Sequence, residues 1–151
     1  MKALMKPLVM LSCLIFPLTG LAADGMVTLK SAHSVSVTAD KLESLLTAKG
    51  MTVMNRISHS EGAAGVDLEL RPTELVIFGN PKVGTPLMQC SQSVAIDLPQ
   101  KALIWEDSEG TVWLGYNDPE YLEKRHNIKG CDKALDKVTG ALAAFSKAAT
   151  E

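Results

Sequence analysis

Residues 74–89 read ELVIFGNPKVGTPLMQ, and the fold depends on the changes of structure within this stretch. ELVIF (74–78) is a continuous apolar run, typical of a strand that is buried on both faces and lies centrally in a sheet. The following GNPKVGTP holds two glycines and two prolines in eight residues, which predicts a loop. Thr85 and Pro86 can then begin a short helix, because proline is tolerated at the first helical position.

Upstream of this stretch the apolar pattern predicts two strands separated by a helix. Branched residues alternate over 27–37 as a strand requires, and those sharing one side are Val27, Leu29, Val35 and Val37. Thr38 can cap a helix over residues 39–49, and Gly50 can end that helix in a left-handed conformation. Residues 51–59 form the next strand, in which His59 shares the side of the apolar residues. EGAAG (61–65) is then a turn or a short helical link.

Downstream, the pattern predicts a hairpin and two helices. Both arms of the hairpin, residues 102–106 and 111–116, are rich in branched and aromatic residues. Asp118 can cap the next helix and Pro119 can begin it. The closing helix lays one apolar stripe on the sheet, formed by Cys131, Ala134, Leu135, Val138, Leu142 and Phe145. These elements predict an α+β domain.

The first residues have the order of a signal peptide. Lys2 and Lys6 precede an apolar run over 7–21, and Ala22 and Ala23 supply small residues for cleavage. The run is shorter than the roughly 20 residues of a membrane anchor, so we expect cleavage and a periplasmic or secreted location. Cleavage after Ala22 is slightly preferred to cleavage after Ala23, because Gly20 and Ala22 are both small. Cys13 would be lost with the signal. Residues 23–151 then form a single domain, and no membrane contact is expected after cleavage.

Charge and cysteine content narrow the function further. Without Lys2 and Lys6 the chain carries a net charge of about −4, which disfavours nucleic acid and anionic lipid as partners because both require a basic face. Cys90 and Cys131 are left as a pair in a compartment where disulfides persist. A disulfide closing this loop would stabilise the fold by roughly 3 to 4 kcal/mol in the chain-entropy model.

Four segments carry a family resemblance: GMTVMNRISH (50–59), LELRPTELVIFGNPKVGTPLMQ (68–89), IDLPQKALIWED (96–107) and VWLGYNDPEYLEKRH (112–126). In this order they resemble the bacterial family called domain of unknown function 302, from about Ser34 to Phe145. The resemblance implies a strand, a helix, four antiparallel strands and a final helix. This is a single sheet with helices packed on one face, similar to one unit of the TATA-box-binding-protein-like fold. It implies no activity, since fold does not carry function, and Cys90 and Cys131 look like departures from the family.

The GNPKVGT loop is the first candidate site. Gly79 and Gly84 would allow close backbone approach, Lys82 supplies a cation, and Thr85 adds a hydroxyl at a helix start, as in anion-binding loops. The alternative is a strand-to-helix turn that needs glycine and proline geometry. His59 is the second candidate, against the alternative of a hydrogen-bonded core histidine. We predict that His59 lies close to the loop.

Three functional hypotheses follow. The first is a non-enzymatic module that binds a small ligand or a metal near His59 and the loop. The second is an interaction protein, a homodimer whose sheet supplies the contact surface. The third is an enzyme with a centre built from His59, Lys82 and Thr85. No metal ligand set is assigned. The residues considered as soft-metal ligands are Met51, Met54, Met88 and His59. The sequence names no cofactor.

Overall fold

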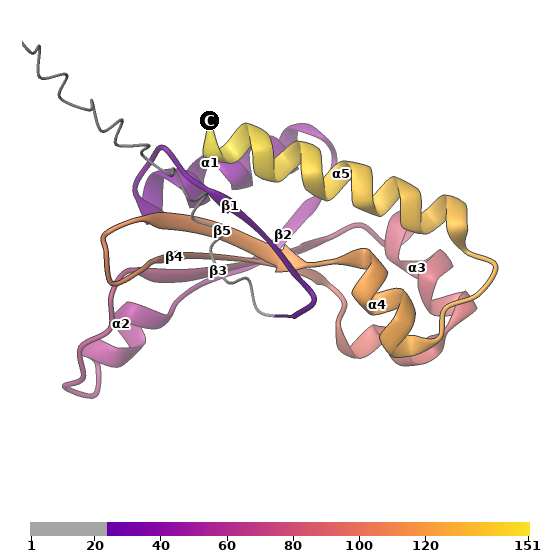
Figure 1. The fold of residues 1–151 in the computed structure, drawn as a ribbon, viewed down its shortest axis with the longest axis horizontal. Helices are drawn as coiled ribbons and strands as arrows, with labels where there is room; N and C mark the ends of the chain where they lie inside the picture. Colours follow the sequence, from indigo (N-terminus) through magenta and orange to yellow (C-terminus); the bar gives the residue numbers. More distant parts are fainter. Residues whose placement is uncertain (1–23) are drawn as a thin grey trace, which may run out of the picture.

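The computed structural model describes residues 24–151, which form one five-stranded antiparallel sheet (Figure 1). Neighbouring strands follow the order β1-β5-β4-β3-β2, and every pair is antiparallel. The strands are β1 (Met26–Lys30), β2 (Thr52–Ser58), β3 (Thr73–Gly79), β4 (Gln100–Glu106) and β5 (Val112–Asn117). The predicted α+β class and antiparallel sheet are therefore confirmed. The expected signal segment, residues 1–22, lies outside the described residues.

Two long helices, α1 (Val35–Ala48) and α5 (Asp132–Thr150), lie side by side on one face of the sheet (Figure 1). Between these helices and the sheet lies the core. The strand residues that point into it alternate along β3, β4 and β5 and are nearly inaccessible: Val76, Phe78, Ala102, Ile104, Leu114 and Tyr116. Burial of this apolar face is the main force that holds the helices on the sheet. The closing helix follows its predicted stripe.

The first helix begins earlier than predicted. Ser34 is its N-cap and accepts the backbone N–H of Val37, so the predicted strand over 27–37 is wrong beyond Lys30. Thr38, predicted as the cap, is instead buried within the helix, where its hydroxyl donates to the carbonyl of Ser34. At the other end Gly50 has φ +73°, the left-handed conformation predicted for it.

The ELVIF strand is interior but is not buried on both faces. Val76 and Phe78 point into the core, whereas Leu75 and Ile77 on the other face are only half-buried. β3 lies between β4 and β2, so the middle strand is β4. A continuous apolar run predicts a strand with both faces covered, but the long helices cover only one face of the sheet.

Four short elements connect these layers: α2 (His59–Ala64), α3 (Pro81–Cys90), the 3-10 helix η1 (Gln92–Ile96) and α4 (Pro119–His126). Asp118 caps α4 as predicted, accepting the backbone N–H of Glu120. The predicted hairpin is β4–β5, with Trp105 opposite Trp113. Within residues 24–151 no helix combines the length and the apolar character that crossing a bilayer demands.

Candidate functional site

The GNPKVGT segment is the start of a helix, so the predicted loop is wrong. α3 begins at Pro81, and Asn80 is its N-cap, accepting the backbone N–H of Lys82 at 2.9 Å. The Asn80 side chain also donates to the carbonyl of Gly50 at 2.9 Å, which ties the start of α3 to the end of α1. Proline is tolerated at the first helical position, and Pro86 lies inside the helix at the cost of one backbone hydrogen bond.

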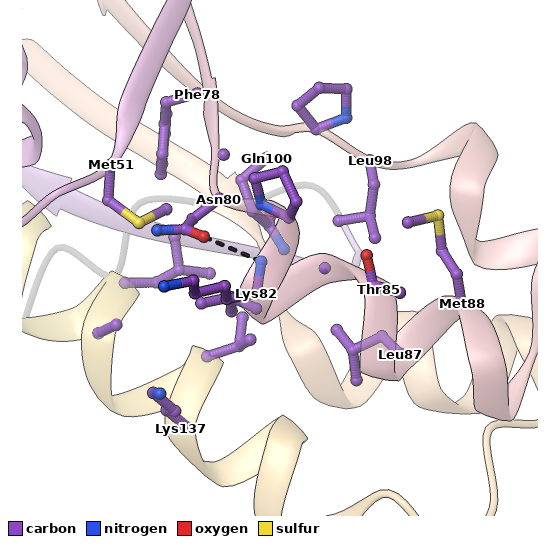
Figure 2. Close-up of a pocket in the computed structure, with 18 of the residues that line it drawn as sticks. Met51, Phe78, Asn80, Lys82, Thr85, Leu87, Met88, Leu98, Gln100 and Lys137 are labelled. Carbon is purple, nitrogen blue, oxygen red and sulfur yellow. Dashed lines mark hydrogen bonds between the residues drawn. The ribbon is translucent and has the colours of Figure 1, made fainter.

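A cavity of about 530 Å³ lies beside this helix (Figure 2). Its walls come from the end of β3, from α3, from the connection that leads into β4 and from the middle of α5. Most of the lining is apolar, including Phe78, Leu87, Leu98 and Leu142. A volume of this size is in the range of small-molecule sites, which are mainly apolar with a few placed polar groups.

One buried polar group in the cavity wall has no partner. Gln100 opens β4 opposite Phe78, is only 8% exposed and lines the cavity. Its amide nitrogen has no hydrogen-bond partner among the described residues. A buried polar atom without a partner costs about 1–3 kcal/mol, and such atoms are rare in folded proteins. A ligand that bonds to this amide would remove the penalty.

Four of the five predicted site residues meet at this cavity. Gly79, Lys82, Gly84 and Thr85 all belong to its lining, so the segment chosen from the sequence is at the cavity even though its predicted conformation was wrong. A side chain at Gly79 would contact Met54 and Pro99 at 3.4 Å. Glycine therefore keeps this part of the wall thin.

His59 does not join them, and the predicted convergence is wrong. In the β2–β3 register Thr52 lies opposite Gly79, whereas Ser58 lies opposite Glu74. His59 follows Ser58, so it lies near the start of β3. The helix α3 begins at the far end of β3, after Gly79. Its side chain is exposed at the first position of α2, where it is not a core histidine either. His59 lies away from Lys82 and Thr85, so these three residues do not form the predicted enzyme centre.

Methionine side chains that the sequence offered as soft-metal ligands also line the cavity, namely Met51, Met54 and Met88. Figure 2 shows Met51 and Met88 on opposite sides of it. Residues 24–151 contain no cluster of three histidine, cysteine, aspartate or glutamate side chains suited to a metal ion. The methionines serve here as flexible apolar wall, a role for which their thioethers are well adapted.

Sequence reasoning missed Gln100, Lys49 and Lys137 as parts of the site. Gln100 did carry a signal, because it shares the strand parity of the buried residues Ala102 and Ile104. A polar residue at a core position is unusual and can indicate a functional role. The two lysines gave no signal, since surface lysines are common and their approach to the cavity depends on tertiary packing.

The disulfide expected from the sequence closes one end of this region. Cys90, the last residue of α3, is joined to Cys131, the N-cap of α5, with 6.3 Å between their α carbons. That distance lies within the range a disulfide spans. Because α3 and α5 both form walls of the cavity, the bond holds two of its sides together.

A second polar group of residues joins η1 to α4. His126 lies 2.6 Å from Asp97 through Nε2 and 3.0 Å from the hydroxyl of Ser93 through Nδ1. Arg125 also contacts Asp97, at 3.2 Å. Serine, histidine and aspartate are the partners of a hydrolase triad, but Ser93 is not part of the cavity lining. The contacts fix the connection that carries Leu98 and Pro99 to the cavity.

At the other end of the molecule Arg56 of β2 links two elements. Its guanidinium bonds to Glu74 of β3 and to Asp40 of α1. The hydrogen bond to Glu74 is the main cause that raises the pKa of Arg56 above its ordinary value. This cluster fastens α1 to the sheet on the His59 side, away from the cavity.

Comparison with known proteins gives a family but no activity. The chain is 45% identical over 112 residues to proteins named fluoride-specific ion channel FluC 1 from Brucella suis biovar 1 and Brucella abortus biovar 1. The match covers 74% of this chain but only 44% and 42% of those proteins, so the chain spans less than half the length of the curated relatives it matches.

The fold also has a solved counterpart. A crystal structure of an uncharacterized conserved DUF302 protein from Bacillus stearothermophilus superposes with a TM-score of 0.75, covering 84% of this chain and 99% of that one at 21% identity. The model of the family described as domain of unknown function DUF302 matches residues 27–145, and the chain belongs to that family.

Proposed function

We propose that this protein is a non-enzymatic module that holds a small, largely apolar ligand in the cavity between α3 and α5. The observation that carries the proposal is the buried, unpartnered amide of Gln100 in the wall of a 530 Å³ cavity. An empty site keeps the cost of that amide, and a ligand with a polar group removes it. Apolar walls supply the rest of the binding free energy by removing ligand surface from water.

The dimensions of the cavity also bear on the fluoride-specific channels that resemble this chain in part. A fluoride ion is a single atom, whereas this cavity has the volume of a site for a molecule of many atoms. The site in this chain therefore favours an organic ligand.

We further propose that the module works in the periplasm or outside the cell. The support is the signal-like order of residues 1–22 together with the disulfide between Cys90 and Cys131, since such bonds persist in oxidising compartments. N-terminal sequencing of the exported protein tests this proposal. A mature chain that begins near Ala23 is the expected result, and one that still begins at Met1 would contradict it.

Ligand binding is tested by filling the cavity. Ala141 of α5 belongs to its lining, whereas Ala144 is exposed on the same helix, so Ala141→Trp and Ala144→Trp form a matched pair. The probe is N-phenylnaphthylamine, a neutral dye whose fluorescence rises in apolar sites. Saturable binding is expected for the wild type and for Ala144→Trp, and little for Ala141→Trp.

Equal binding by the two tryptophan variants would mean that the dye lies elsewhere and that the proposal is wrong. Mass spectrometry of protein purified under native conditions supplies the second measurement. An organic compound retained by the wild type and absent from Ala141→Trp identifies the natural ligand.

A further inference from the structure

The cavity wall carries charge of one sign only. Its ionisable residues are Lys49, Lys82 and Lys137, and neither aspartate nor glutamate is among the lining residues. The chain as a whole is acidic, with 17 acidic against 15 basic residues. A cavity wall that contains lysines but no carboxylates therefore differs in charge from the protein as a whole.

The three lysines come from different parts of the fold. Lys49 caps the end of α1, Lys82 lies in the first turn of α3, and Lys137 lies in the second turn of α5. None of them has a carboxylate oxygen within 4.0 Å among the residues that the structure describes. Their charges are thus left for another partner to neutralise.

Positive charge lies at one end of the cavity, whereas apolar surface extends to the other end. Figure 2 shows Lys82 and Lys137 on the same side as Met51, while Leu98 and Met88 lie on the other. Gln100 pairs with Phe78 at the end of β3 from which α3 starts. The unpartnered amide is therefore near the helix start that carries Lys82, at the polar end of the site.

A cavity with a charged end and an apolar end favours ligands that have a charged group at one end and an apolar chain at the other. An anionic group among the lysines gains Coulomb energy that partial exclusion of water increases, and it can accept a hydrogen bond from Gln100. An apolar chain that extends toward Leu98 and Met88 gains from burial. A cationic molecule would be repelled, and a neutral one would leave the lysines without a counter-charge.

We infer that the ligand is an anionic amphiphile, of which a long-chain carboxylate is the simplest form, with its charged group at Lys82 and Lys137 and its chain toward Leu98 and Met88. This inference rests on the proposed function and adds the chemical class of the ligand. The occupant is a single small molecule, because the volume of about 530 Å³ fits a drug-sized ligand.

The test uses three probes with the same alkyl chain: dodecanoate, dodecanol and dodecyltrimethylammonium. Each competes with N-phenylnaphthylamine on the full exported protein, at neutral pH, at low ionic strength and below its micelle concentration. Dodecanoate is expected to compete about tenfold more tightly than dodecanol, and the cationic probe most weakly. The advantage of dodecanoate should shrink with added salt, because salt screens partly exposed charges.

Lysine variants assign the effect to the cavity. Lys82→Gln combined with Lys137→Gln should weaken dodecanoate binding about fivefold to tenfold, in line with two partly exposed ion pairs, and leave dodecanol binding unchanged. The control combines Lys133→Gln with Lys147→Gln, which removes the same charge from exposed lysines of α5 outside the lining. It should bind both probes as the wild type does.

The outcomes separate the two claims. If dodecanol and dodecanoate compete equally, or if the control variant loses as much dodecanoate affinity as the cavity variant, the inference about charge is wrong while the binding module stands. If no probe competes with the dye and Ala141→Trp changes nothing, the proposed function and the inference are both overturned.

Discussion

The α carbons of Cys90 and Cys131 lie 6.3 Å apart, and the bond between these residues joins the last turn of α3 to the N-cap of α5. The two cysteines are 41 residues apart in the sequence. A crosslink over a loop of that length restricts the unfolded chain, and in the chain-entropy model this amounts to about 3 to 4 kcal/mol.

Replacing both cysteines, Cys90→Ser with Cys131→Ser, should therefore lower the free energy of unfolding by about 3 kcal/mol in urea titrations. Dithiothreitol should produce the same loss in the wild type and none in the variant. Binding of N-phenylnaphthylamine should also weaken, because the disulfide holds together α3 and α5, which both form walls of the cavity. An unfolding curve that is insensitive to the reductant would contradict this prediction.

Gln100→Leu should raise the stability of the ligand-free protein by about 1 to 2 kcal/mol. Leucine has a similar volume and removes an amide whose buried nitrogen lacks a partner. Gln89→Leu, at an exposed position of α3, is the control and should change stability by less than about 0.5 kcal/mol. Loss of stability in Gln100→Leu would show that the amide has a partner in solution.

Gly140→Ala should stabilise the protein by about 0.5–1 kcal/mol, the cost of glycine inside a helix. Gly140 lies in α5, and a β carbon there would meet no atom within 4 Å. Gly25→Ala is the contrasting change, because Gly25 has φ +79° and its β carbon would come within 2.4 Å of the Tyr121 ring. Thermal unfolding should move upward for the first variant and downward for the second.

Asp107 should make stability depend on pH in the acid range. Its carboxylate accepts the indole N–H of Trp113 at 2.8 Å and the backbone N–H of Thr111 at 2.9 Å, and these bonds lower the pKa of Asp107 from its ordinary value of 3.8. A carboxyl group whose pKa falls on folding adds stability above the unfolded pKa and loses it as pH falls through the folded value.

The stability difference between the wild type and Asp107→Asn should therefore be constant near neutral pH and shrink below about pH 4. Urea unfolding followed by tryptophan fluorescence measures this difference, and Trp113 reports directly on the contact. A difference that grew toward acid pH would mean that the bonds favour the protonated carboxyl.

The sequence predicted most of the sheet because its strands carry clear local signals. The hairpin of β4 and β5 has branched and aromatic arms around the turn at Asp107–Gly110, and Gly110 takes the positive φ of +77° that this turn needs. The closing helix has an apolar stripe long enough to exclude other structures. Asp118 and Pro119 form a helix start whose chemistry is entirely local.

The helix starts at Ser34 and Asn80 were missed because local patterns there support two readings. Val35 and Val37 continue the parity of β1, yet the hydroxyl of Ser34 caps a helix over the same residues. In GNPKVGTP the glycines and prolines suggest a loop, but Asn80 caps a helix in which Pro81 occupies the one position that suits proline. Packing of α1 on the sheet decides the first case.

His59 was placed at the wrong end of the sheet because an antiparallel pair puts the end of β2 beside the start of β3, with Ser58 opposite Glu74. The direction of its side chain was wrong for a separate reason. Its predicted direction relied on unbroken alternation from Met51, but the register of β2 shifts between Val53 and Asn55, and such a bulge changes the face on which later residues lie. The strand also ends at Ser58, so alternation no longer applies to His59. Neither feature leaves a clear trace in the sequence.

The position of β1 in the sheet affects the order in which the chain folds. Val27 pairs with Tyr116 and Leu29 with Leu114, and the backbone N–H of Ala32 donates to the carbonyl of Thr150 at 2.9 Å. Contacts between residues so distant in sequence form late, because a long loop must close first. The first strand cannot pair until β5, at residues 112–117, has been synthesised, so the sheet is completed only after most of the chain has left the ribosome.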